Sequence, residues 1–147
     1  MDLFIKLQDS INKYSEHNAF FINGVFYSYY DLAVVISKIR KSIQINTNDS
    51  EKIIGIVAND DIETYSAIIA LWFEGKAYVP LNSEYPIGRN ANIISQTNII
   101  TVLDSSEKLF LNNLQIIETK KLHKTAIDLI PKKTHKSNLA YLLFTSG

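Results

Sequence analysis

The residues best placed to do chemistry lie at the carboxyl end of the chain, where an apolar run leads into Thr145, Ser146 and Gly147. The run 139–144 has the composition of a buried strand, so the turn after it would stand at the carboxyl edge of a sheet, where open α/β sheets bind ligands. Two hydroxyl groups, a flexible glycine and successive backbone N–H groups can together form a concave anion site. A plain turn would have the same three residue types, so both interpretations stay open on these residues alone.

A second candidate is the acidic pair Asp60-Asp61, which follows an apolar run and resembles the metal-binding acids of a phosphate-accepting signalling domain. In that case both carboxylates should line one pocket together with Asp104. The alternative is that one aspartate caps the next helix and the other is solvated. We expect the basic run 132–136 to be a solvated loop, because the chain carries no positive excess.

The three histidines His17, His123 and His135 are scattered, and no two of them have a metal-ligand spacing such as i, i+4. We expect them to be exposed or loop residues, and we assign no metal site and no catalytic residue to this chain. The absence of cysteine excludes disulfides, thiolate catalysis and cysteine-based zinc or iron–sulfur sites.

Composition narrows the class of protein further. The chain has 147 residues, of which 46% are hydrophobic and 20% are charged, and its formal net charge is zero. One core is the natural expectation at this length. A neutral chain is a poor non-specific ligand for nucleic acid or anionic membrane. The longest apolar run is far shorter than the roughly 20 residues of a membrane span, and the first residues do not read as a secretory signal. We therefore expect a soluble, cytoplasmic protein without nucleic-acid or membrane partners.

Hydrophobic patterns alternate between strand and helix from residue 53 onward. Apolar β-branched runs typical of buried parallel strands alternate with segments of helical spacing. This order predicts an α/β fold with a mostly parallel sheet and helices on both faces, preceded by a short β-hairpin at Asn23-Gly24. The expected strands are 53–58, 77–81, 99–103, 114–117 and 139–144, and the expected helices are 2–14, 28–44, 64–74, 86–96 and 105–113. We expect Ser28 to cap the second helix with help from Asp31, Pro86 to open the fourth, and 120–138 to be a loop with at most one helical turn.

Three segments together resemble the adenylate-forming (AMP-binding) ligases. Residues 75–89, GKAYVPLNSEYPIGR, resemble the family pattern GGAYVP(L/I)DxxYPxxR. Residues 141–147, YLLFTSG, resemble the opening of the family's phosphate loop, Yxx(F/Y)TSG(T/S)TGxPK. Residues 25–32, VFYSYYDL, match the family's (L/Y)(T/S)Yx(E/D)L. The segments occur in the family's order and span nearly the whole chain. The resemblance is closest to amino-acid-activating adenylation domains of non-ribosomal peptide synthetases and to D-alanine–carrier-protein ligases.

The resemblance implies that residues 1–147 form the N-terminal portion of an adenylation domain, ending inside the phosphate loop. It implies that Thr145, Ser146 and Gly147 begin the ATP-binding loop of a ligase that uses ATP and Mg²⁺. Such a ligase activates a carboxylate, an amino acid in the branch that the chain resembles most, for transfer to the thiol of a carrier protein or CoA. The chain departs from the family pattern at Lys76, Asn82 and Gly88, where the family has Gly, Asp and Glu.

Family members are far longer, and the loop lysine and later catalytic segments are missing here, so we expect this polypeptide alone to form no adenylate. Without the missing C-terminal remainder, apolar surface should be left exposed and promote self-association. The alternative is a non-catalytic binding or assembly module that keeps the fold.

Overall fold

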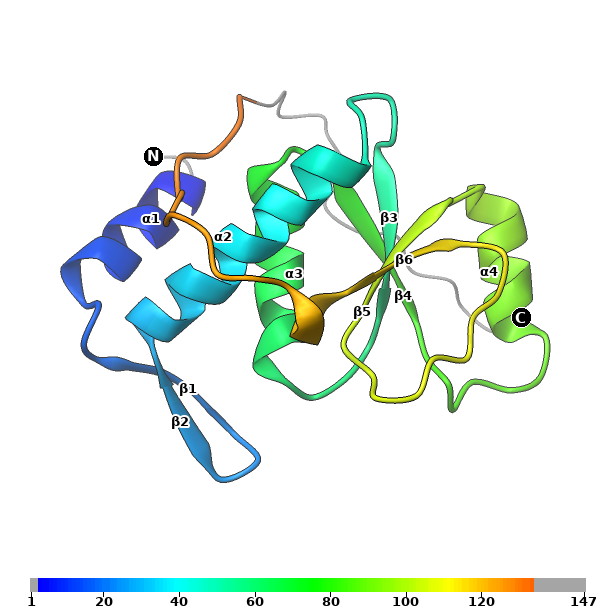
Figure 1. The fold of residues 1–147 in the computed structure, drawn as a ribbon, viewed down its shortest axis with the longest axis horizontal. Helices are drawn as coiled ribbons and strands as arrows, with labels where there is room; N and C mark the ends of the chain where they lie inside the picture. The colour runs from blue at the N-terminus through cyan, green and yellow to red at the C-terminus, as the bar shows by residue number, and fades with distance from the viewer. Residues whose placement is uncertain (1–2, 134–147) are drawn as a thin grey trace.

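The computed structural model describes residues 3–133 and shows a four-stranded sheet between helices, with a small hairpin set to one side (Figure 1). The elements in chain order are α1 (Leu3–Lys13), β1 (Asn18–Ile22), β2 (Val25–Ser28), α2 (Tyr29–Asn46), β3 (Ile53–Val57), α3 (Ile62–Phe73), β4 (Ala77–Leu81), α4 (Arg89–Thr97), β5 (Thr101–Asp104), β6 (Gln115–Glu118) and the 3-10 turn η1 (Thr119–Lys121). The predicted α/β class is confirmed, whereas the predicted strand 139–144 lies outside the described residues.

The larger sheet has the strand order β4-β3-β5-β6, and all of its neighbouring strands are parallel. Strand β3 pairs with β4 from Ile53↔Ala77 to Val57↔Leu81, so both strands begin at one edge and end at the other. Because all strands run in the same direction, the sheet has one edge where all of them begin, the amino edge, and one where all of them end, the carboxyl edge. Parallel strands of this kind also need both faces covered.

Two apolar clusters cover the two faces of this sheet, as predicted. On one face α2 and α3 pack through buried side chains such as Ile36 and Leu71 onto Ile54 and Ile56 of β3. On the other face the single buried residue of α4, Ile93, joins the side chains of β3, β4 and β5. Figure 1 shows α3 and α4 on opposite sides of the strands.

The local signals in the first half of the chain form the expected structures. The hairpin turn has Asn23 at φ 50° and Gly24 at φ 80°, both in the left-handed region that a two-residue turn of this kind requires. Ser28 and Asp31 form a reciprocal capping box, with the Asp31 N–H donating to Ser28 Oγ at 3.0 Å and the Ser28 N–H donating to the Asp31 carboxylate at 2.9 Å. The two bonds fix the start of α2 directly after the hairpin.

One helix prediction was wrong, and the predicted fourth helix exists but starts later than expected. Residues 105–113 form a loop, because the Ser106 N–H donates to Asp104 Oδ1 at 2.8 Å and so turns the chain away from a helix. The fourth helix begins at Arg89 rather than at Pro86, since the Arg89 N–H donates to the carbonyl of Pro86 at 3.0 Å in a turn. Gly88, at φ 85°, supplies the left-handed backbone that joins this turn to the helix.

An extended strap, residues 122–133, follows η1 and crosses α2 (orange in Figure 1). Its backbone is held by side chains of the helix: the Asp128 N–H donates to Ser37 Oγ at 2.9 Å, and the Asp128 carbonyl accepts from the Arg40 guanidinium at 3.0 Å. Farther along, the Lys132 N–H donates to the carbonyl of Phe73 at 2.8 Å. The predicted loop is thus correct as far as residue 133.

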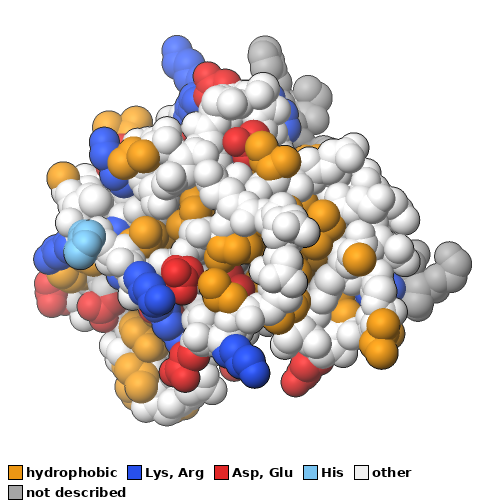
Figure 2. Space-filling model, turned by 45° about the vertical axis from the view of Figure 1, so that its right-hand side comes forward, with side chains coloured by type: hydrophobic (Ala, Val, Ile, Leu, Met, Phe, Trp, Pro, Cys, Tyr) orange, Lys and Arg blue, Asp and Glu red, His pale blue; other side chains and the backbone are white. Residues whose placement is uncertain are grey.

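Several large apolar side chains are exposed. Figure 2 shows hydrophobic side chains in separate groups among charged ones on the face it displays. The most exposed are on the hairpin, at the end of α2, before α4, before β5 and in the strap, namely Phe21, Val25, Phe26, Ile45, Ile87, Ile100 and Ile130. Within residues 3–133, no helix is long and apolar enough to cross a membrane.

Candidate functional site at the carboxyl edge of the sheet

The predicted phosphate-loop residues Thr145, Ser146 and Gly147 lie outside the described residues, so the structure does not place them. It does describe the carboxyl edge at which they were expected. Polar residues follow two neighbouring strands there: Asn59 comes shortly after β3, and Ser105 and Ser106 come directly after β5. Sequence reasoning missed these three residues, although their positions after two buried apolar runs could have indicated them.

These residues form a hydrogen-bonded group, the carboxyl-edge cluster, which consists of Asn59, Asp61, Thr64, Ser105 and Ser106. The Asn59 side-chain amide donates to the hydroxyl oxygens of Ser105 and Ser106, each at 3.0 Å. The Ser105 hydroxyl in turn donates to Asp61 Oδ2 at 2.6 Å. The cluster therefore connects the ends of β3 and β5 to the beginning of α3.

Asp61 is the residue on which the cluster converges. Its Oδ1 accepts the Thr64 N–H at 2.8 Å and the Thr64 hydroxyl at 2.6 Å, which makes it the N-cap of α3. A helix N-terminus favours negative charge, so the carboxylate is stabilised there. The Lys120 ammonium lies 3.9 Å from Asp61 Oδ2, and with 47% of its side chain exposed it contributes little to stability.

The cluster positions backbone rather than supplying a nucleophile. Ser105 is 4% exposed, so its hydroxyl is not accessible to a substrate even though it donates to a carboxylate. What the arrangement offers chemically is a rigid rim of hydroxyl and amide groups beside the N-terminus of α3. Such a rim can orient an adjacent loop at the ligand-binding edge of the sheet.

The acidic-site hypothesis does not hold for Asp60, Asp61 and Asp104. Asp61 caps α3, Asp60 is exposed and accepts the Tyr65 hydroxyl at 2.8 Å, and Asp104 is buried and accepts the Ser106 N–H. Within residues 3–133 no group of three or more histidine, cysteine, aspartate or glutamate side chains could hold a metal ion. The capping interpretation of the pair is confirmed.

Two buried polar atoms at this edge have no hydrogen-bond partner within the described part of the chain: Asp104 Oδ2 and Thr119 Oγ1. The two atoms belong to the ends of neighbouring strands, because Asp104 of β5 pairs with Glu118 of β6 and Thr119 directly follows Glu118. Buried polar groups normally have hydrogen-bond partners. Among the described residues, these two atoms at the ends of β5 and β6 have none, so each could still form a hydrogen bond.

The histidines contribute no site in the described residues. His17 and His123 are both exposed, as predicted, and the His17 ring stacks on Tyr14 with ring centroids 5.4 Å apart. His135 lies outside the described residues, as does Lys136, whereas Lys132 and Lys133 at the start of the basic run are exposed, as expected.

The segment 75–89, which carries the strongest resemblance, has a structural role here. The Asn82 carbonyl accepts from the Asn90 side chain at 2.7 Å, while the Asn82 N–H donates to the Asn90 side-chain oxygen at 3.1 Å. The Arg89 guanidinium lies over the Tyr85 ring, 5.1 Å from its centroid. These contacts set the path of the chain from the end of β4 to the start of α4.

The open parallel sheet with helices on both faces and a polar carboxyl edge defines an α/β domain of the kind that binds ligands at its strand ends. No protein-family model matches the chain. Its fold is that of non-ribosomal peptide synthetase structures. The synthetase FmoA3 bound to AMPPNP superposes with a TM-score of 0.82 at 19% identity, over 98% of this chain and 16% of that one. The N-terminal subdomain of Klebsiella oxytoca NpsA, in complex with 3-hydroxyanthranilyl-AMSN, superposes with a TM-score of 0.74 at 16% identity, over 99% of this chain and 37% of that one.

Sequence similarity gives the same answer. The chain is 32% identical over 131 residues to N-(5-amino-5-carboxypentanoyl)-L-cysteinyl-D-valine synthase of Penicillium rubens, over 82% of this chain and 4% of that protein. It is 26% identical over 127 residues to tyrocidine synthase 1 of Brevibacillus parabrevis, over 82% of this chain and 12% of that protein. The chain is thus a homologue of non-ribosomal peptide synthetases with the fold of their amino-acid-activating adenylation domains, which confirms the resemblance seen in the sequence. It spans only a small part of the length of these relatives.

Proposed function

We propose that this chain is the N-terminal portion of a domain that activates an amino acid as an aminoacyl-adenylate. The observation that carries the proposal is the 32% identity over 131 residues to a peptide synthase of Penicillium rubens. The fold shared with FmoA3, a structure that holds AMPPNP, is consistent with ATP as the second substrate. The carboxyl-edge cluster lies at the edge where such a fold binds ligands.

In the proposed reaction a carboxylate oxygen of the amino acid attacks the α-phosphorus of ATP. The bond between that phosphorus and the bridging oxygen to the β-phosphate breaks, and pyrophosphate leaves. The thiolate of a carrier protein or of CoA then attacks the acyl carbon, and AMP leaves as the thioester forms. Both steps depend on positioning and on charge stabilisation of the phosphates.

The chain's own contribution to this reaction is positional. We propose that Thr145, Ser146 and Gly147 begin the loop that holds the phosphates of ATP, and that the carboxyl-edge cluster supports the edge of the sheet beside that loop. The described residues contain no group of three or more histidine, cysteine, aspartate or glutamate side chains that could hold Mg²⁺. We place the reaction in the cytoplasm, where ATP is available.

Amino-acid-dependent exchange of pyrophosphate into ATP tests the proposal. The assay compares the 147-residue chain with the longest polypeptide that its gene encodes, each with a panel of the common amino acids. We expect exchange with at least one amino acid in a longer polypeptide and none in the 147-residue chain, which lacks the lysine of the family's phosphate loop. Exchange by the short chain, free of contaminating enzyme, would contradict its expected inactivity. A longer polypeptide that neither exchanges pyrophosphate nor binds ATP would refute the proposed function.

A further inference from the structure

A cavity of about 140 Å³ opens at the amino edge of the sheet, opposite the carboxyl-edge cluster. Two of its residues, Lys52 and Lys76, directly precede β3 and β4, which begin side by side. Four lysines and two acids line it: Lys52, Lys76, Lys132, Lys133, Asp49 and Glu74. The proposed function uses none of these residues.

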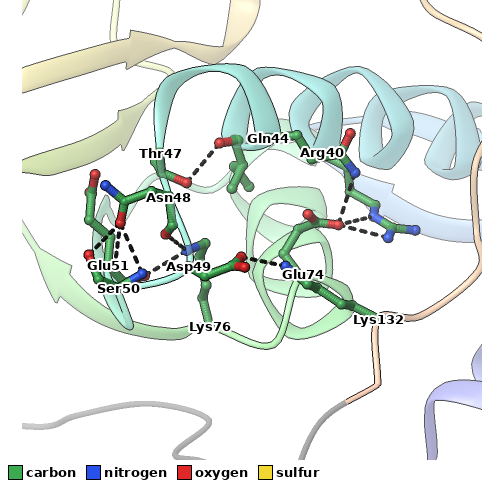
Figure 3. A network of polar contacts seen from close by, with 11 residues as sticks. Arg40, Gln44, Thr47, Asn48, Asp49, Ser50, Glu51, Glu74, Lys76 and Lys132 are labelled. Carbon is green, nitrogen blue, oxygen red and sulfur yellow. Dashed lines mark hydrogen bonds and ion pairs between the residues drawn. The ribbon is translucent and has the colours of Figure 1, made fainter.

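Both carboxylates of the cavity are already neutralised by neighbouring cations (Figure 3). Glu74 Oε2 accepts two hydrogen bonds from the Arg40 guanidinium, at 2.7 and 2.9 Å, and a third from the Gln44 amide at 3.2 Å. Asp49 accepts from the Lys132 ammonium at 2.6 Å. The nearby lysine lowers the pKa of Asp49, so this carboxylate is ionised and paired. The remaining three lysines therefore give the cavity a positive surplus.

One of these three lysines is buried. Lys76 is 6% exposed, and its ammonium donates to the carbonyls of Asn48 and Glu51 at 2.7 and 2.6 Å, which leaves one N–H for another partner. Burial lowers the pKa of Lys76; the carboxylates of Glu51 and Asp49 work against this shift, and the charges of Lys132 and Lys52 add to it. An anion in the cavity would relieve this repulsion. The segment 75–89 resembles a family pattern with glycine at this position, so the buried ammonium is a feature of this chain.

The other two lysines are open to a ligand. Lys52 and Lys133 are exposed, and the ammonium group of neither has a hydrogen bond or ion pair with any described residue. Their ammonium groups stand at the cavity that also contains the Lys76 ammonium. Lysine is a strong point-charge partner for phosphate groups. The combination of one buried and two unpaired ammonium groups at a single cavity is typical of an oxyanion site.

We propose that this cavity binds a small phosphate-type anion, of the size of inorganic phosphate or pyrophosphate. Its volume is several times the roughly 30 Å³ that one water molecule occupies. It is well below the roughly 300 Å³ at which pockets for drug-sized ligands begin, so a nucleoside triphosphate does not fit inside it. The proposal is independent of the proposed function, whose ATP loop is expected at the opposite edge of the sheet.

Thermal unfolding in increasing phosphate or pyrophosphate, against sodium chloride of equal ionic strength, tests the proposal. At tenfold excess over Kd we expect a rise in Tm of about 4 °C beyond the effect of chloride. The double variant K52Q/K133Q should lose this rise. The matched variant K6Q/K108Q, which removes two exposed lysines elsewhere, should keep it. The two anion series separate phosphate from pyrophosphate as the preferred ligand.

A gain-of-binding variant makes the test independent of lost stability. Asp49→Asn removes an exposed negative charge and frees the Lys132 ammonium, so the Kd for the anion should fall about fivefold. A rise in Tm that is no larger than in chloride, or one that survives in K52Q/K133Q, would overturn the proposal. Weaker anion binding by Asp49→Asn would overturn it as well. A failure of pyrophosphate exchange would leave all of these outcomes unchanged, because they do not require adenylate formation.

Discussion

Arg40 and Glu74 form a buried ion pair in which two guanidinium nitrogens donate to one carboxylate oxygen at 2.7 and 2.9 Å. The Arg40 and Glu74 side chains are only 4% and 5% exposed. The pair connects α2 to the end of α3, and the Arg40 guanidinium also donates to the carbonyl of Asp128 in the strap. One arginine thus connects two helices and the extended strap that crosses them.

Breaking this pair from one side should be strongly destabilising. Glu74→Ala leaves the buried Arg40 guanidinium with only the half-exposed Asp128 carboxylate, 3.5 Å away, so we expect the free energy of unfolding to fall by about 3–5 kcal/mol. Urea unfolding followed by circular dichroism measures the loss, with Lys41→Ala on the exposed face of α2 as the control. The double variant R40M/E74M should lose much less than the sum of the single variants, because no uncompensated charge remains. Additive losses would contradict a coupled pair.

The sequence was informative wherever a local chemical rule decides the structure. Asn23-Gly24 specifies a hairpin turn because both residues tolerate positive φ, and β-branched runs such as 53–57 specify buried strands. The rules failed at 105–113, where a long-range bond acts together with the local bond between Ser106 and Asp104 against a helix. The Ser105 hydroxyl is held by Asp61, 44 residues earlier in the chain, and no local pattern reveals such a partner.

The polar networks were harder to predict than the fold for the same reason. Arg40 and Glu74 are 34 residues apart, and Arg40 and Asp128 are 88 apart, so only the packing of α2 against α3 and the strap brings them together. The candidate phosphate loop 145–147 was predicted from a motif, and it stays a prediction because it lies outside the described residues. The carboxyl-edge cluster depends on which strands are neighbours, and here β5 rather than β4 supplies its two serines.

Gly55, in the middle of β3, should tolerate no side chain. A Cβ at this position would lie 2.8 Å from Ile99 Cδ1 and 2.9 Å from Val102 Cγ2, well inside normal contact distance. Both neighbours are buried and cannot move freely. We expect Gly55→Ala to lower the free energy of unfolding by about 1–3 kcal/mol through overpacking, as measured by urea unfolding.

The steric origin of this effect can be tested by a second substitution. Ile99→Val deletes the Cδ1 atom that the new methyl group would meet. The double variant G55A/I99V should therefore be destabilised by less than the sum of the two single variants. If the effects are simply additive, crowding against Ile99 Cδ1 does not contribute to the cost of Gly55→Ala.

Tyr65 should titrate above the ordinary tyrosine range. Its hydroxyl donates to Asp60 at 2.8 Å, and this hydrogen bond raises the pKa of the phenol. A raised folded-state pKa means that the stabilisation is fully present below pH 10 and is lost as the pH rises through the folded-state value. The difference in tyrosinate absorbance between the native chain and Tyr65→Phe reports this titration, and Asp60→Asn should move it back toward the ordinary value. An unshifted titration in the native chain would refute the contact.

The hairpin should promote self-association of the isolated chain. Phe21 and Phe26 face each other across β1 and β2 with ring centroids 4.5 Å apart, and each is 63% exposed. The two strands pair only with each other among the described residues, so each also has an open backbone edge that a second copy could pair with. We expect sedimentation velocity to show association that increases with protein concentration and weakens in F21S/F26S. The control I45S/I87S removes two apolar side chains outside the hairpin that are even more exposed than Phe21 and Phe26, and it should associate like the native chain. If both double variants behave alike, or if the native chain stays monomeric, the hairpin is not the contact surface.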